Sequence, residues 1–136
     1  MKIIYTLVLL ICLIGCSKEQ KQQQQENLVV QAMVNGQWKV TSFNKGGTDV
    51  TSDFSVYKFQ FKSDLTVDAI NNGAVEKTGA WNADANAQTI TSNFSNAVNP
   101  LVLLNGTWTI TNTTWTSVQA NQTVNGELRT LRLDKL

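Results

Sequence analysis

The sequence contains no histidine, and its only two cysteines, Cys12 and Cys16, both lie close to the start. Beyond Cys16 the chain therefore lacks the side chains that most often act as general bases, nucleophiles and zinc ligands. The carboxylates are scattered, and none has a partner at a spacing typical of paired acid–base catalysis. These absences argue against an enzyme, a metal site or another cofactor, and they leave no disulfide to stabilise the core.

Excess charge of either sign is also missing. The chain has 11 Lys and Arg against 10 Asp and Glu, for a formal net charge of +1 at pH 7. Nucleic-acid binding requires a basic field that a balanced chain does not provide. We therefore expect no nucleic-acid partner.

No apolar run is long enough to span a membrane. The apolar stretch from Ile3 to Gly15, which follows Lys2, would extend roughly 20 Å as a helix, short of the roughly 30 Å hydrocarbon core. A positive residue, a short apolar core and a small residue before the cleavage point are typical of a secretory signal. We expect residues 1–15 to be such a signal peptide.

The apolar stretch runs into Leu13-Ile14-Gly15-Cys16. This run resembles the lipobox of bacterial lipoprotein signal peptides. The resemblance implies that Met1–Gly15 is removed and that Cys16 is acylated, with palmitate among its acyl chains. Each buried methylene adds about 0.8 kcal/mol, so more than one chain gives stable membrane anchoring. An ordinary signal peptide, in which Cys16 has no role, is the alternative.

Two features after Cys16 bear on localisation. By the same resemblance, Ser17 at this position, rather than an Asp, fits sorting to the outer membrane. Lys18-Glu19 resembles the short charged export signals of surface lipoproteins in Bacteroidetes-type bacteria. We expect a lipid-anchored outer-membrane protein, with display at the cell surface favoured over the inner leaflet.

Residues 16–34 form the predicted tether. The segment SKEQKQQQQEN over residues 17–27 is polar and favours a solvated linker, although a helix starting from a Ser17–Gln20 capping box is an alternative. Leu28, Val29, Ala32 and Met33 lie at helical spacings. They predict a short helix near Leu28–Val34 that Asn35-Gly36 ends and that closes one end of the folded domain.

The apolar period changes to two after Gly36, where the predicted domain over residues 35–136 begins. Tyr57-Lys58-Phe59-Gln60-Phe61-Lys62 is the clearest case, with aromatic and polar side chains on opposite faces. The same alternation predicts eight strands: Trp38–Phe43, Tyr57–Lys62, Thr66–Ala69, Lys77–Asn82, Gln88–Phe94, Gly106–Thr111, Thr114–Ala120 and Glu127–Asp134. Most of these strands are separated by turn signals, which include Asn71-Asn72-Gly73, Asn112-Thr113 and Asn125-Gly126.

Short strands with brief connections indicate an all-β meander. Each strand has one apolar face, which a closed barrel or a second sheet must cover. We predict an eight-stranded antiparallel up-and-down β-barrel, because closure removes exposed edges and no long crossover suits a Greek key. A sandwich of two four-stranded sheets is the alternative. We expect one domain and a monomer.

Gly36-Gln37-Trp38 opens the first strand, and Arg129 lies on the inward face of the last. This arrangement resembles the lipocalin superfamily, in which a Gly-x-Trp packs against a late arginine. The region from Asn35 to Leu136 resembles the small lipocalin-like lipoproteins of Bacteroidetes-type bacteria. The resemblance implies that Trp38 closes the barrel floor and that Arg129 stacks on its ring as a cation–π pair.

An eight-stranded barrel is just wide enough to be filled by side chains or to hold one small ligand. We therefore consider a pocket for a small apolar or amphipathic ligand formed by Phe59, Trp81, Ser92 and Trp108. In the alternative, these side chains are core, and the protein is an envelope structural or protein-interaction lipoprotein with no small-molecule ligand.

Two further features concern the surface. Trp115 lies out of phase with Val118 and Ala120, which predicts an exposed ring suited to contact with a partner or a sugar, or simply a lone surface aromatic. Asp49 and Asp53 flank a loop that fits a capped turn better than a calcium site, because the glycine spacing of an EF-hand is missing.

Overall fold

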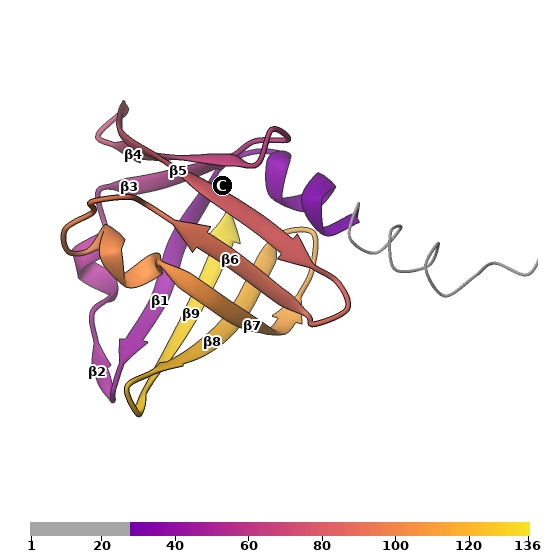
Figure 1. Ribbon diagram of the computed structural model, residues 1–136. Coiled ribbons are helices and arrows are strands. Elements are labelled where there is room, and N and C mark those ends of the chain that lie inside the picture. Colours follow the sequence, from indigo (N-terminus) through magenta and orange to yellow (C-terminus); the bar gives the residue numbers. More distant parts are fainter. Residues whose placement is uncertain (1–27) are drawn as a thin grey trace, which may run out of the picture.

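The computed structural model describes residues 28–136, which form one β-barrel domain (Figure 1). A helix over residues 28–34 precedes nine strands and two short 3₁₀ helices. The predictions for the signal peptide, Cys16 and the start of the tether concern residues outside this range. The elements are β1 (Trp38–Lys45), β2 (Thr48–Asp49), η1 (Thr51–Phe54), β3 (Tyr57–Phe61), β4 (Thr66–Asn71), β5 (Ala74–Asp84), β6 (Thr89–Asn93), η2 (Leu101–Leu104), β7 (Gly106–Thr113), β8 (Ser117–Val124) and β9 (Glu127–Lys135).

The sheet closes on itself. From β3 to β9 each strand pairs antiparallel with the next, and β1 pairs with both β3 and β9. The β1–β9 ladder runs from Trp38 opposite Lys135 to Lys45 opposite Arg129. The two-residue strand β2 only extends the end of β1. The prediction of an all-β, eight-stranded antiparallel barrel is confirmed, and the two-sheet sandwich is wrong.

Alternation places the apolar side chains inside. In β3, Tyr57, Phe59 and Phe61 are buried while Lys58 is exposed. Gly79 of β5 lies under the ring of Phe94, on the same inward face as Trp81. The strand faces expected from the period of two are therefore the ones that form the core.

The helix over residues 28–34 covers one end of the barrel, which we call the tether end because the preceding segment joins it there (Figure 1). Met33 is buried against the barrel interior. Gly36 follows the helix with a φ of +89°, a conformation that glycine adopts without steric cost. The predicted helix and its end are confirmed.

The opposite end is covered by segments that the sequence pattern did not predict. The ring of Phe54 from η1 stacks on Phe43 at 5.2 Å between centroids. Leu101 and Leu104 of η2 are buried within the long connection between β6 and β7. Both ends of the barrel are therefore closed by side chains of the chain itself.

One predicted turn is displaced. Asn112-Thr113 continues β7, and Asn112 pairs with Gln119 in the β7–β8 ladder, so the strand predicted from Thr114 starts at Ser117 instead. The turn forms at residues 114–116 because the Thr114 hydroxyl accepts hydrogen bonds from the backbone N–H groups of Thr116 and Ser117. The turn is therefore stabilised by a threonine side chain and not by the predicted asparagine.

Candidate functional site

The interior of the barrel holds a small apolar cavity with a volume of about 40 Å³. Of the four residues predicted to form a ligand pocket, Phe59, Ser92 and Trp108 line it, and Trp81 does not. Ligand pockets have volumes of roughly 300–1,000 Å³. The cavity is far below that range, because aromatic and aliphatic side chains fill the barrel.

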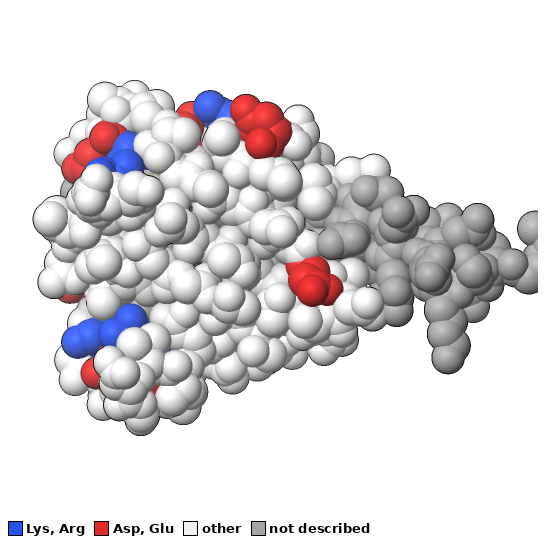
Figure 2. Space-filling view, viewed as in Figure 1, with Lys and Arg blue, Asp and Glu red and all other residues white. Residues whose placement is uncertain are grey.

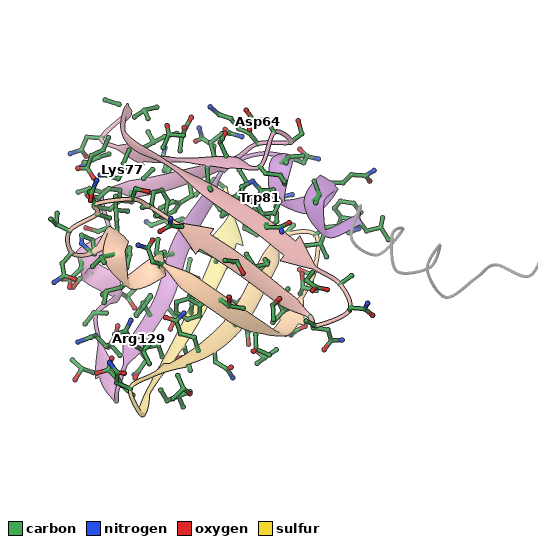
Figure 3. All side chains as sticks on the ribbon, viewed as in Figure 1. Asp64, Lys77, Trp81 and Arg129 are labelled. Carbon is green, nitrogen blue, oxygen red and sulfur yellow. The ribbon has the colours of Figure 1, made fainter. Side chains whose placement is uncertain are left out.

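The donors of the residues predicted to form the ligand pocket are already hydrogen-bonded. The Trp108 indole donates to the Leu104 carbonyl at 2.9 Å, and the Ser92 hydroxyl donates to the same oxygen. Trp81 lies nearer the tether end (Figure 3), where its indole donates to the Lys62 carbonyl at 3.0 Å and its ring meets Phe61 edge-on. These groups hold the core together, and none of their N–H or O–H donors points unpaired into the cavity.

Trp38 closes the tether end of the barrel, but its cationic partner differs from the predicted one. Its side chain is fully buried, and its indole donates to the Met33 carbonyl at 2.8 Å. Lys135 Nζ lies 5.0 Å from the centre of the ring. The helix and β9 therefore both contact the Trp38 side chain.

The predicted stacking of Arg129 on Trp38 is wrong. Arg129 is paired with Lys45 at the opposite end of β9, and its Nε lies 2.9 Å from Glu127 Oε1 (Figure 3). The reason is the direction of the strands: antiparallel closure brings the start of β1 to the end of β9, where Lys135 lies. Strand polarity was the signal that could have identified Lys135.

Three carboxylates are held in hydrogen-bonded networks. The pKa of Asp68 is lowered chiefly by the hydrogen bond from Lys62 and next by that from Thr78, each 2.6 Å long. Glu76 accepts from the Tyr57 hydroxyl at 2.7 Å, which lowers the pKa of Glu76, while burial is the main cause that raises the pKa of Tyr57.

Arg132 likewise lowers the pKa of Asp134 through hydrogen bonds to its carboxylate. All three carboxylates are thus ionised near neutral pH, which is unfavourable for a general acid.

Elsewhere the acidic residues serve turns. Asp49 Oδ1 accepts hydrogen bonds from both the N–H and the hydroxyl of Thr51, at 2.9 and 2.6 Å, so the predicted capped turn is confirmed. Among residues 28–136 no cluster of three or more acidic or cysteine side chains is close enough to hold a metal ion.

The Asp68 network makes the protein sensitive to acid. The pKa of Asp68 in the folded state is below its unfolded value of about 3.9, so its stabilising effect is complete above that value and is lost as the pH falls through the folded pKa. We expect Asp68→Asn to lower the free energy of unfolding at pH 6 and to have a progressively smaller effect below about pH 4. Urea unfolding of both proteins from pH 3 to 7 measures this, and a difference independent of pH would contradict it.

Four of the nine large apolar side chains exposed on residues 28–136 lie at the tether end, and the other five, Val56, Val75, Val98, Val102 and Leu128, lie elsewhere. Leu28 begins the helix, Leu65 lies in the β3–β4 turn, Trp115 lies in the β7–β8 turn and Leu136 follows β9, with exposed fractions of 51%, 42%, 54% and 63%. We call these four residues the tether-end rim. Trp115 is exposed as predicted, although it lies in the turn itself.

Backbone hydrogen bonds connect parts of the rim. The N–H of Lys135 donates to the carbonyl oxygen of Thr116 at 2.8 Å, which holds the end of β9 beside the Trp115 turn. The N–H of Leu136 donates to the carbonyl oxygen of Gln37 at 2.9 Å. An open groove of about 490 Å³ lies beside Leu28, between the helix and the ends of β5, β6 and β7. The strands β6, β7 and β8 contain no charged residue, and few charges appear on the face shown in Figure 2.

The fold and its filled core define a small closed eight-stranded antiparallel barrel. No family model matches the sequence, and neither does any curated protein. A solved structure of a DUF4847 family protein from Bacteroides vulgatus ATCC 8482 is similar, with a TM-score of 0.54 and 14% identity over 78% of this chain and 96% of that one. At this identity the similarity shows a shared fold and nothing further.

Within the described range, no helix has both the length and the apolar character to cross a membrane.

Proposed function

We propose that this protein is an outer-membrane lipoprotein, anchored by acyl chains on Cys16, whose filled barrel acts through its outer surface on another component of the cell envelope. The observation that carries this proposal is the occupied interior. The cavity of about 40 Å³ is several-fold smaller than a small-molecule pocket. A barrel that encloses no ligand offers its partners only its exterior and its ends.

The anchor is supported by the sequence before the domain. Leu13-Ile14-Gly15-Cys16 resembles a lipobox, and the polar residues 17–27 connect it to the tether end. Ser17 and Lys18-Glu19 favour the outer membrane and display at the cell surface. A non-enzymatic role is supported by Asp68, Glu76 and Asp134, whose pKa values are lowered by their hydrogen-bond partners.

Binding of a small apolar ligand inside the barrel is the second candidate function. It is favoured by the fact that Phe59, Ser92 and Trp108 line one apolar cavity directly below Met33. A ligand of ordinary size would require Met33 and the helix to move outward. The tight hydrogen bond between Trp38 and the Met33 carbonyl opposes that movement.

Replacement of Cys16 tests the anchor. A Cys16→Ser protein has no thiol to acylate, so we expect it to lose palmitate labelling and to leave the membrane fraction or to remain unprocessed. The wild-type chain and a Cys12→Ser chain, which changes the other cysteine of the signal segment, are the matched controls. Retention of label and of membrane association by Cys16→Ser would reject the anchor.

Native mass spectrometry of the detergent-extracted protein separates the two candidate functions. For a filled barrel we expect the mass of the acylated chain alone. A small molecule that stays bound in a fixed ratio, and that is lost when Trp108→Ala disturbs the cavity wall, would overturn the filled-barrel proposal in favour of a ligand carrier.

A further inference from the structure

We propose that the tether-end rim rests on the bilayer that holds the anchor, with the Trp115 ring at the level of the lipid headgroups. The inference rests on the proposed anchoring through Cys16 and adds to it an orientation and a second membrane contact. The occupant of the rim is thus a lipid surface and not a protein.

The rim is built from four separate parts of the chain that converge on one end. Leu28, Leu65, Trp115 and Leu136 each expose between 42% and 63% of their surface there. The rest of the domain also exposes large apolar side chains, but these are four valines and Leu128, whereas the rim carries three leucines and a tryptophan. Leucine and tryptophan offer more apolar area to a surface than valine, and tryptophan is enriched at membrane interfaces. One of the four, Leu28, begins the helix over residues 28–34, which closes the barrel at that end (Figure 1).

Trp115 differs from the other tryptophans in its polar contacts. The indole N–H groups of Trp38, Trp81 and Trp108 donate to carbonyl oxygens at 2.8–3.0 Å. Trp115 has no such acceptor among residues 28–136 and is 54% exposed. An indole that is apolar except for a free N–H group suits the boundary between lipid headgroups and acyl chains.

The chain before the domain points to the membrane as the occupant. Eleven residues, Ser17 to Asn27, separate Cys16 from Leu28, and even fully extended they span at most about 40 Å. The acylated residue therefore holds the rim close to the bilayer and raises the effective concentration of lipid around it. The same eleven residues carry no apolar side chain, so they cannot cover the rim themselves.

The charges near the rim favour a neutral surface. Lys62 is held by Asp68 and Arg132 by Asp134, so both of these cations are compensated. Lys135 lies over the Trp38 ring. Asp64 in the β3–β4 turn and Asp84 at the end of β5 add negative charge. The rim thus lacks the excess of lysine and arginine that binds anionic lipid, and zwitterionic headgroups fit it better.

Tryptophan quenching tests the contact. The acylated full chain is reconstituted into phosphatidylcholine vesicles with or without bromine on the acyl chains. The Trp115 signal is the emission of the wild type minus that of Trp115→Phe. Because the other three tryptophans are buried, we expect bromine to lower the Trp115 signal by about twofold and to leave the Trp115→Phe emission nearly unchanged.

A tryptophan moved to the other end is the matched control. Leu128, at the opposite end of the barrel, is exposed to the same 54% as Trp115, so a Trp115→Phe/Leu128→Trp protein carries a comparable reporter there. We expect this reporter to remain unquenched. Equal quenching at both ends, or none at Trp115 in protein that floats with the vesicles, would overturn the orientation.

The two proposals fail in different ways. Protein that is acylated and floats with the vesicles, yet shows no quenching at Trp115, retains the anchor and rejects the rim contact. Protein that carries no acyl chain rejects the anchor, and the rim contact falls with it.

Discussion

Trp38→Ala is expected to lower the free energy of unfolding by about 3–5 kcal/mol, the usual range for truncation of a large buried aromatic. The Trp38 side chain is fully buried, and three elements depend on it. It pairs with Phe59 of β3 and with Lys135 of β9, and its indole holds the helix through the Met33 carbonyl. Its removal would leave a cavity and free a buried carbonyl at the same time.

Two further variants make this result interpretable. Trp38→Phe keeps most of the apolar volume but cannot donate to Met33, so we expect a smaller loss than for alanine. Trp115→Ala removes the same ring from an exposed turn and should change stability by no more than about 0.5 kcal/mol. Urea denaturation followed by circular dichroism measures all three. An effect of Trp38→Ala as small as that of Trp115→Ala would show that Trp38 does not support the core.

Gly79→Ala is expected to destabilise the fold by about 1–3 kcal/mol, although it adds only one carbon atom. A Cβ at Gly79 would lie 2.6 Å from the backbone oxygen of Asn93 and 2.8 Å from the ring of Phe94. A side chain could turn aside, but the oxygen of Asn93 belongs to the neighbouring strand. The substitution must therefore push β5 and β6 apart.

Ala80→Ser is the control for Gly79→Ala. Ala80 is the next residue of β5, faces outward and is exposed, so one added atom meets no neighbouring strand. We expect a stability close to that of the wild type, measured by the same urea titration. If Gly79→Ala were equally neutral, the close packing of Phe94 over β5 would not be a constraint on the barrel.

Much of the fold could be predicted because one face of each strand is buried. The alternation in Tyr57–Phe61, for example, predicts both a strand and its inward face, and the helix before Gly36 follows from apolar spacing. The 3₁₀ helices could not be predicted in this way. Phe54, Leu101 and Leu104 lie in segments with no period, and their burial depends on the barrel end that they cover.

The candidate site was predicted less completely, for a physical reason. Sequence identified the aromatic residues of the interior, but the volume left between them depends on packing that no pattern reveals. Arg129 and Lys135 both lie on β9, and only the antiparallel pairing with β1 decides which of them meets Trp38. The exposure of Trp115 was predicted correctly, but from the phase of a strand that starts only at Ser117. The convergence of the rim required the three-dimensional arrangement.

The ladder between β1 and β9 also has a consequence for biogenesis. Trp38 and Lys135 are direct neighbours in the sheet although they lie near opposite ends of the described sequence. Contacts so distant along the chain slow folding, because a long loop must close before they form. A polypeptide that leaves a translocation channel from its amino end cannot complete this seam until its ninth strand has emerged. Under the export that we propose, the aromatic residues of the chain would stay uncovered until that strand arrives.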